Sequence, residues 1–439
     1  MVPRELANHV CDTLQRNGFQ ALLAGGCVRD TLLGRPASDY DVATDATPEQ
    51  VLSLFPEGVA VGARFGVIVV PRDGLKVEVA TFRSDVGYSD GRHPDSVVYS
   101  RTPQEDVQRR DFTVNGMLMR HDSGEVLDFV GGKADLNAGV IRAIGEPDRR
   151  FSEDKLRMLR AVRFAARFGY AIESGTLDSI QHHAAEIAQV SCERIREELT
   201  KLLTEGGARR GFELLDEVKL LKPILPEVAA YQGVEQPRQF HPEGDVWVHT
   251  LMMLEGLKAG CEAELAWGVL LHDVGKPATL RSAEETGDRI RFDGHVEVGI
   301  TMGEAICRRL RFSNEETEQI ISLVANHMRF KDATHMRTAT LKRFVRLPRF
   351  DEHLELHRLD CLCSNGSTES YDFVRRFLAE TPAEEVRPAR LLTGDDLIEM
   401  GMRPGPEFSM ILQAVEDGQL EGKIPDRETA VEFVRRNYV

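Results

Sequence analysis

Hydrophobic residues recur along this chain in two patterns, and the change from one to the other divides it. Apolar positions at helical spacing over residues 3–18 predict an amphipathic helix, and Pro48 is typical of the first turn of another. Short apolar or alternating runs predict strands that begin at Leu22, Gly66 and Lys76. The N-terminal part therefore mixes strands with helices.

The remainder of the chain has a helical period almost throughout. Residues 191–225 follow this period, with an interruption at Gly206 and Gly207. Residues 232–246 have no period and contain several helix-breaking residues, so we expect a domain boundary there. The sequence therefore predicts an α+β fold, in which a small mixed sheet with helices is followed by an all-α part.

Length and composition narrow the class of protein. A chain of 439 residues has material for roughly two to four domains, and no apolar run is long enough to span a membrane. The N-terminus lacks a signal-peptide core, and the seven cysteines are scattered without a C-x-x-C pair. We therefore expect a cytoplasmic protein with reduced thiols that does not bind membranes.

The formal net charge of −16 would by itself argue against nucleic-acid binding. The charge is unevenly distributed, however, because residues 141–170 hold eight lysines and arginines against four acidic residues. This segment predicts a local RNA-binding face on an otherwise acidic molecule.

The stretch over residues 22–44 carries the first candidate chemistry. Gly25 and Gly26 follow a predicted strand and precede a predicted helix, where the backbone can approach a phosphate closely. Asp39 and Asp41 alternate on the next predicted strand, so we expect both carboxylates on one face. Two carboxylates beside a phosphate cradle suit Mg²⁺ bound together with a nucleotide, which is the minimum for two-metal nucleotidyl transfer.

Four further segments of the N-terminal part are polar. Glu78 is either a third carboxylate near the metals or the solvent-facing side of its strand. Residues 83–101 lack an apolar period and predict a mobile loop, and residues 109–115 pair arginines with an Asp and an Asn, which suit triphosphate and ribose hydroxyls. Residues 128–136 predict a strand end and a glycine turn before a helix, with a structural role at least as plausible as ligand contact.

A basic helix is predicted over residues 151–167, with Ser152 as its N-cap. Five charged residues fall on roughly one half of this helix: Asp154, Arg157, Arg160, Arg163 and Arg167. Asp154 and Arg157 are three residues apart and therefore neighbours, which in an isolated pair would indicate an ion pair on a solvated face.

Four motifs together resemble those of the class II tRNA nucleotidyltransferases and their close relatives, the bacterial poly(A) polymerases. In chain order they are GGCVRDTLLG with DYD, RRDFTVN, DFVGGKADL and EDKLRMLRAVRF. The resemblance covers about residues 20–170. It implies a polymerase-β-like head in which Asp39 and Asp41 bind Mg²⁺. It also places the nucleotide-binding motif on Arg110, Asp111 and Asn115.

The same resemblance implies that Asp154 and Arg157 read the incoming base. An aspartate accepts from an exocyclic amino group and an arginine donates to a ring nitrogen, as cytosine and adenine require, whereas uracil and guanine present the reverse order. Each buried polar group left unpaired costs roughly 1–3 kcal/mol, so one Asp/Arg pair can select cytosine and adenine over uracil and guanine. We also expect nucleotide contacts from Gly25, Gly26, Arg29, Arg160 and Arg163.

The C-terminal half contains residue types that bind metals. The motifs LLHDVGKP and HRLDCLC, with histidines before and between them, resemble the HD phosphohydrolase superfamily. Its core ligand positions would be His249, His272, Asp273 and Asp360, and two further histidines, His295 and His327, would extend the site to a second metal. Imidazoles and carboxylates suit Mn, Fe, Zn, Ni or Mg, so the metal stays open. The site would hydrolyse phosphomonoesters or 2′,3′-cyclic phosphates, or only stabilise the domain.

Together these observations predict four parts: a nucleotidyltransferase head (1–140), a helical neck and body with the base-selecting helix (141–235), an HD-type metal domain (236–370) and a helical tail (371–439). The tail resembles RNA-gripping segments of relatives, although it is acidic.

We expect a CCA-adding tRNA nucleotidyltransferase that uses CTP and ATP and releases pyrophosphate. The loop over residues 83–101, with Asp90, Gly91, Arg92 and Pro94, would help to switch the site from C to A, since relatives that add only CC tend to lack it. Three alternatives stay open: an A-adding enzyme or poly(A) polymerase, an HD phosphohydrolase of RNA end repair with the head as a tRNA-binding module, and a non-catalytic RNA-binding or nucleotide-sensing protein. The sequence does not indicate an oligomeric state.

Overall fold

The computed structural model describes residues 2–37, 39–62, 66–86 and 96–439. Contacts divide the chain into two compact units. The first unit comprises Met1–Ala229, Leu257–Cys261 and Arg309–Arg311, and the second unit comprises Ala230–Gly256, Glu262–Arg308 and Phe312–Val439. The four-part division expected from the sequence stays a prediction.

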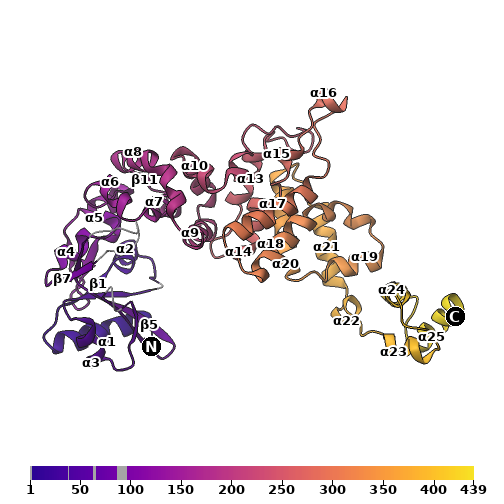
Figure 1. The fold of residues 1–439 in the computed structure, drawn as a ribbon, viewed down its shortest axis with the longest axis horizontal. Coiled ribbons are helices and arrows are strands. Elements are labelled where there is room, and N and C mark those ends of the chain that lie inside the picture. Colours follow the sequence, from indigo (N-terminus) through magenta and orange to yellow (C-terminus); the bar gives the residue numbers. More distant parts are fainter. Residues whose placement is uncertain (1, 38, 63–65, 87–95) are drawn as a thin grey trace. The chain divides into compact units, whose positions relative to one another are not determined.

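The first unit is built on a mixed sheet of seven strands in the order β3-β4-β5-β2-β1-β8-β9 (Figure 1). Its strands are β1 (Ala21–Ala24), β2 (Asp41–Thr44), β3 (Val59–Gly62), β4 (Val67–Arg72), β5 (Leu75–Thr81), β8 (Met117–Met119) and β9 (Val126–Asp128). Within this sheet, as far as the structure describes it, the β2–β5 pair is parallel and the other pairs are antiparallel. Two small two-stranded sheets pair β6 (Arg83–Val86) with β7 (Ser96–Tyr99), and β10 (Val140–Ile141) with β11 (Ala171–Ile172).

The helices of the first unit pack on this sheet and then continue beyond it as helical layers. They are α1 (Pro3–Arg16), α2 (Gly26–Leu32), α3 (Pro48–Leu54), α4 (Pro103–Gln108), η2 (Thr113–Asn115), α5 (Gly132–Ala138), α6 (Pro147–Glu153), α7 (Leu156–Phe168), α8 (Ser174–His183), η3 (Ala184–Gln189), α9 (Cys192–Thr204), α10 (Ala208–Glu217), α11 (Leu221–Ile224) and α12 (Pro226–Ala229). The α+β fold, the first amphipathic helix and the helix break at the glycine pair are confirmed. Gly207 ends the break at φ 79°, and a side chain there would collide with the carbonyl oxygen of Ala166.

Three local predictions were wrong. Residues 83–86 and 96–99 form β6 and β7, because their backbones pair with each other even though their side chains show no apolar alternation. The segment between them, with Asp90, Gly91, Arg92 and Pro94, lies outside the described residues. The structure also breaks the predicted 151–167 helix and begins the second strand later than expected.

The helix break falls at Asp154, which has an extended backbone with φ −149° and ψ 106°. Its carboxylate accepts from the backbone N–H of Leu156 at 3.1 Å, so the side chain competes with the helix and starts α7 anew. Ser152 is therefore no N-cap. It lies inside α6, and its hydroxyl donates to the carbonyl of Arg149.

The second strand begins at Asp41, so Asp39 precedes it. Strand β1 ends at Ala24, opposite Asp41, because Gly25 turns the chain into α2 with φ 74°. No residue of β1 therefore remains to pair with Tyr40 or Asp39.

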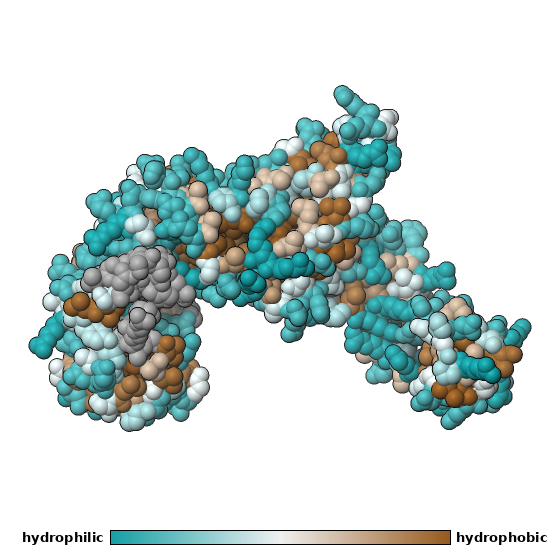
Figure 2. Space-filling model, in the orientation of Figure 1, coloured by the Kyte–Doolittle hydropathy of each residue, from teal (hydrophilic) through white to brown (hydrophobic). Residues whose placement is uncertain are grey.

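The second unit is helical. Its elements are α13 (Val246–Glu255), α14 (Ala263–Leu271), α15 (Lys276–Thr279), α16 (Ala283–Thr286), α17 (His295–Arg309), α18 (Asn314–Asn326), η4 (His327–His335), α19 (Thr338–Phe344), α20 (Phe350–Cys363), α21 (Glu369–Glu380), α22 (Ala383–Val386), α23 (Gly394–Glu399), α24 (Glu407–Leu420) and α25 (Arg427–Tyr438). Hydrophilic residues cover the tip formed by α16 in the space-filling view (Figure 2).

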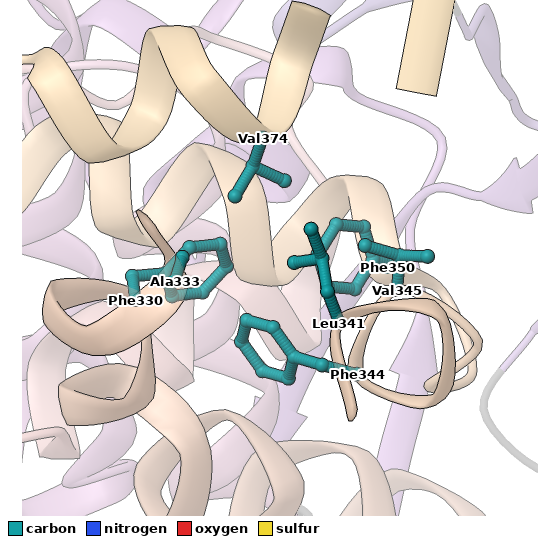
Figure 3. Close-up of a cluster of buried hydrophobic side chains, with 7 residues drawn as sticks. All are labelled: Phe330, Ala333, Leu341, Phe344, Val345, Phe350 and Val374. Atoms are coloured by element: carbon teal, nitrogen blue, oxygen red, sulfur yellow. The ribbon is translucent and has the colours of Figure 1, made fainter. Parts of the chain in front are cut away.

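One core of the second unit lies where η4, α19, α20 and α21 meet. Figure 3 shows its side chains turned toward one another, and the rings of Phe330 and Phe344 meet edge to face with centroids 4.7 Å apart. No helix among the described residues is long and apolar enough to cross a membrane. The expected cytoplasmic location stays a prediction.

Candidate functional site

A carboxylate pair lies where strand β2 begins, beside the middle of strand β5. The parallel register of β2 and β5 places Asp41 opposite Glu78. Burial, followed by repulsion from Glu78, raises the pKa of Asp41 to about 6 although Arg110 acts in the opposite direction. Asp39 adds further negative charge near Asp41. Such a surplus of carboxylate charge fits a divalent cation with oxygen ligands.

The glycine turn brings α2 to the same place. Arg29 on α2 is buried, donates to Asn115 Oδ1 at 2.6 Å, and lies with its guanidinium 4.6 Å from the ring centroid of Phe168. Asn115 in turn donates to Asp111 Oδ1 at 3.3 Å. The orientation of the Arg29 side chain is therefore fixed by these contacts.

Asp111 joins this network to the basic helix α7. Its Oδ2 accepts two bonds from Arg160, at 2.9 and 2.6 Å, and its Oδ1 accepts the backbone N–H of Phe112. Burial alone would raise the pKa of Asp111, but Arg160 and these hydrogen bonds lower it. Asp111 thus stays charged and fixes the arginine over the site.

Asp154 and Arg157 lie beside each other along the chain but do not pair. Asp154 Oδ2 accepts from Arg194 at 2.7 Å. Arg157 donates from Nη1 to Glu153 and to the carbonyl of Arg150, and from Nη2 to the carbonyl of Arg109. The solvated Asp154–Arg157 ion pair considered from the sequence is therefore absent, because each side chain is held by another partner.

These groups line one cavity of about 460 Å³. Ten of the predicted residues line it: Gly25, Gly26, Arg29, Asp41, Arg110, Asp111, Asn115, Asp154, Arg157 and Arg160. Asp39 and Arg163 do not. Arg163 is buried and pairs instead with Glu198 at 2.7 Å and Glu205 at 2.8 Å.

Sequence reasoning missed three lining residues, Leu156, Phe164 and Arg194, and it named Arg109 only as part of the 109–115 segment. Arg109 lay inside a motif that was recognised, whereas Arg194 lies on α9, and no pattern in the sequence connects it to Asp154. With these residues the cavity holds six arginines against three aspartates. This excess of fixed guanidinium groups suits a polyphosphate.

The glycine turn at residues 128–136 has a structural role. The carboxylate of Asp128 accepts the backbone N–H groups of Val130, Gly132 and Lys133, at 3.2, 2.9 and 2.9 Å. It therefore caps the start of α5, and it does not line the cavity.

The second unit gathers histidines at helix ends. His272 and His327 follow the last residues of α14 and α18, and His295 begins α17. Nδ1 of each ring carries a proton, because Nδ1 lies 2.7–2.9 Å from a backbone carbonyl three residues earlier and donates to it. Nε2 of each ring is therefore a lone-pair nitrogen that can bind a metal.

The six predicted residues form two groups of three ligands, which the neighbours His272 and Asp273 join, and a third group shares His249. One group is His249, His272 and Asp360, and the other is Asp273, His295 and His327. Asp360 Oδ1 lies 3.3 Å from His249 Nε2, and Asp273 Oδ1 lies 3.8 Å from His327 Nε2. All six residues predicted from the sequence are therefore close together.

The electrostatics of this cluster fit a cation. Nε2 of His249 and Nε2 of His272 are buried and make no aligned hydrogen bond with the described residues. Burial alone would lower the pKa of His249, but its contacts with Asp360 and Glu243 raise it to about 9. His249 is therefore protonated between two carboxylates when no ion is bound, and a divalent cation would take the place of that proton. Burial lowers the pKa of His327 to about 4, which keeps that imidazole neutral. Imidazoles beside carboxylates are the donor set of a transition-metal or magnesium site.

The cluster opens into a cavity of about 680 Å³, where sequence reasoning missed several residues. Lys276 donates to Asp273 at 2.7 Å and to Gln236 at 2.6 Å. His241 also lines the cavity, and Glu243 lies behind it. The lysine stands in the HDVGK motif, whereas the other three lie in an aperiodic segment that predicted only a boundary.

The fold and the two sites define a nucleotidyltransferase head joined to a helical part with an HD-type metal cluster. Three family models match the chain: the poly A polymerase head domain over residues 21–142, a probable RNA- and SrmB-binding site of polymerase A over 169–232, and the HD domain over 246–362.

A CCA-adding enzyme of Levilactobacillus brevis is 31% identical over 428 residues, which covers 97% of this chain and 96% of that relative. The CCA-adding enzyme of Geobacillus stearothermophilus is 42% identical over 227 residues, covering 52% of this chain and 56% of the relative. The chain belongs to the CCA-adding enzymes, as its motifs indicated.

Solved structures agree. The crystal structure of the Bacillus stearothermophilus CCA-adding enzyme in complex with CTP matches with a TM-score of 0.76 and 26% identity, over 100% of this chain and 98% of that one. The Thermotoga maritima CCA-adding enzyme complexed with tRNA shares the fold, with a TM-score of 0.60 at 20% identity, over 99% of this chain and 95% of that one.

Proposed function

We propose that this chain adds C, C and A in turn to the 3′ end of tRNA from CTP and ATP, without a nucleic-acid template. The 3′-hydroxyl of the tRNA attacks the α-phosphate of the nucleotide, and pyrophosphate leaves. The observation that carries the proposal is the arginine-lined cavity, which has Asp41 at its wall together with Asp154 and Arg157. Relatives solved with CTP and with tRNA support the substrates.

The residues of the cavity have different roles according to their chemistry. Arg29, Arg110 and Arg160 are placed to bind the triphosphate, because their guanidinium groups are already oriented by Asn115, Asp106 and Asp111. Asp39 and Asp41 would hold Mg²⁺, which supplies positive charge to the attacking oxygen and to the phosphates. Glu78, opposite Asp41, is placed to join them.

Asp154 and Arg157 are rigid enough to read a base. Asp154 is fixed at both oxygens, by Leu156 N–H and by Arg194, yet each carboxylate oxygen accepts more than one bond. Arg157 uses three of its five N–H groups on the contacts described above, so donors remain for a ring nitrogen. A rigid acceptor beside a rigid donor favours C and A and leaves unpaired groups against U and G.

The test is incorporation of labelled CTP and ATP, separately and together, into two tRNAs, one ending at the discriminator base and one ending in CC. Complete CCA on the first tRNA supports the proposal. Addition of A to the CC-ending tRNA alone would make the chain an A-adding enzyme, and long A tracts would make it a poly(A) polymerase.

We propose further that the histidine cluster binds one or two divalent metal ions and hydrolyses phosphomonoesters or 2′,3′-cyclic phosphates at RNA ends. The specific observation is that buried Nε2 atoms and Asp273 face a cavity that also holds Lys276, a cation suited to phosphate. The bound metal would supply a water nucleophile at neutral pH. Release of phosphate from RNA ending in a 3′-phosphate, measured with each metal in turn, tests this activity. No release with any metal would leave the cluster a structural site.

A further inference from the structure

The aperiodic loop over residues 235–245 contacts the histidine cluster through Glu243, which lies against Nδ1 of His249. We propose that Glu243 of this loop is a positioning residue for the metal site, holding His249 in the tautomer whose Nε2 can bind the metal. The inference rests on the metal site proposed above, and it gives a role to a segment that the sequence marked only as a boundary.

His249 needs a partner that the other histidines of the cluster do not need. His272, His295 and His327 lie at helix ends, where backbone carbonyls are available to accept from Nδ1. His249 lies inside α13, where the carbonyl of Val246, three residues earlier, already accepts from the hydroxyl of Thr250. A side chain from outside the helix must therefore orient this ring.

Glu243 supplies that partner. Its side chain is only 4% exposed, and Oε1 lies 2.8 Å from His249 Nδ1 and 2.9 Å from His241 Nδ1. An ionised carboxylate only accepts hydrogen bonds, so both imidazoles donate from Nδ1. When the rings are neutral, as metal binding requires, their Nε2 atoms are therefore the nitrogens that carry the lone pair. In His249 that atom faces Asp360 within the first ligand group, and the ring of His241 lines the cavity.

The loop that carries Glu243 is closed at its base. Glu235 and Asp245 form an antiparallel bridge, and Gln236 N–H donates to the carbonyl of Gly244 at 3.0 Å. Asp245 then caps α13 by accepting Val248 N–H at 3.1 Å. Glu243 and His249 are thus tied to the same helix start, which fixes their separation.

The alternative is that these residues bind an ion of their own. His241, Glu243 and His249 lie close enough together to ligate an ion of their own. His249 would then have to bind metals through both nitrogens, which requires loss of both ring protons. A carboxylate that accepts two Nδ1–H bonds needs no such ionisation, and orienting carboxylates of this kind are the common partners of metal-bound histidines.

The test measures Co²⁺ affinity and stoichiometry of the full-length chain by calorimetry. A double variant, Asp273→Ala with Asp360→Ala, removes one carboxylate from each ligand group and defines binding elsewhere in the chain. Glu297→Gln, an exposed carboxylate lining the same cavity, is the matched control. We expect Glu243→Ala to weaken binding at the cluster by about 10- to 100-fold. Glu243→Gln should recover most of this loss, because the amide oxygen still accepts from Nδ1. Glu297→Gln should bind as the wild type does.

The outcomes separate the inference from the proposal beneath it. If the wild type binds no more Co²⁺ than the double variant does, the metal site itself fails. If the wild type binds and Glu243→Ala binds equally well, or the glutamine variant is no better than alanine, the positioning role is overturned. A loss of one whole ion in Glu243→Ala would make Glu243 a ligand and would also overturn it.

A measurement on the wild type tests the inference even if a variant does not fold. Long-range ¹⁵N–¹H spectra of the Zn²⁺-loaded, histidine-labelled chain report which ring nitrogen carries the proton, with His249 assigned from a His249→Gln variant. A proton on Nδ1 of His249 supports the inference. A proton on Nε2, or on neither nitrogen, overturns it.

Discussion

The arginine cavity of the first unit and the histidine cavity of the second unit both gather charged side chains, but they hold them in different ways. In the first, side chains hold one another across long stretches of sequence: Arg29 bonds to Asn115, Arg160 to Asp111, and Asp154 to Arg194. In the second, three of four histidines are held by a carbonyl three residues earlier.

This difference has a consequence for how each site responds to change. A long-range network of ion pairs couples its members, so one substitution disturbs several orientations. A histidine held by its own helical turn depends on little beyond that turn. We therefore expect substitutions in the first cavity to alter several functions at once, and substitutions in the second to act locally, with His249 as the exception.

The largest effect is expected from Asp41→Ala. It removes the partly buried carboxylate in the wall of the arginine cavity, and nucleotide addition should fall by at least about 10³-fold, since a catalytic metal contributes several kcal/mol. Binding of tRNA in a filter assay should persist. Glu57→Ala, an exposed carboxylate elsewhere in the first unit, is the control. Turnover retained in Asp41→Ala would refute the metal assignment.

Asp273→Ala should be nearly as severe, but in the other cavity. Asp273 contacts His272 and Lys276 and is one of the three ligands of the second group, so its loss should abolish Co²⁺ binding by that group and any phosphate release. Addition of CCA, measured in parallel, should be unchanged. Loss of both activities would show that the two sites are coupled.

Arg157→Ala tests base reading. Removing the donor should reduce the preference for CTP and ATP over UTP and GTP by about 10-fold or more, because the arginine no longer leaves U and G with unpaired groups. Misincorporation is measured with each nucleotide alone on both tRNAs. Arg120→Ala, an exposed arginine paired with Glu125, is the control. Unchanged selectivity would move base reading to other residues.

The smallest effect concerns stability. The folded-state pKa of Asp41 is raised to about 6, so its charge opposes folding above that pH, and the cost disappears as pH falls toward 4. Asp41→Asn should therefore raise the free energy of unfolding by about 2 kcal/mol at pH 8 without divalent ions, and by less at pH 5. Urea unfolding at both pH values checks this. A lower free energy of unfolding for Asp41→Asn at pH 8 would show that the charge of Asp41 does not oppose folding.

Local periodicity and ordered motifs predicted the α+β fold, ten residues of the arginine cavity and all six metal-ligand candidates. What they missed depends on tertiary contacts. Arg194 reaches Asp154 across 40 residues, and Asp154 breaks its helix because its side chain competes with the backbone. Arg163 has the same spacing as the cavity arginines, but Glu198 and Glu205 take it elsewhere. Glu243 lies in a segment without any period.

The central claim is that nucleotide addition depends on the arginine cavity and not on the histidine cluster. The most direct test is to sequence the 3′ ends of tRNA lacking CCA after incubation with all four nucleotides. The wild type, Asp41→Ala and Asp273→Ala are compared in one experiment. We predict complete CCA ends for the wild type and Asp273→Ala, and unextended ends for Asp41→Ala. CCA ends made by Asp41→Ala, or their absence with Asp273→Ala, would contradict the account of two separate sites.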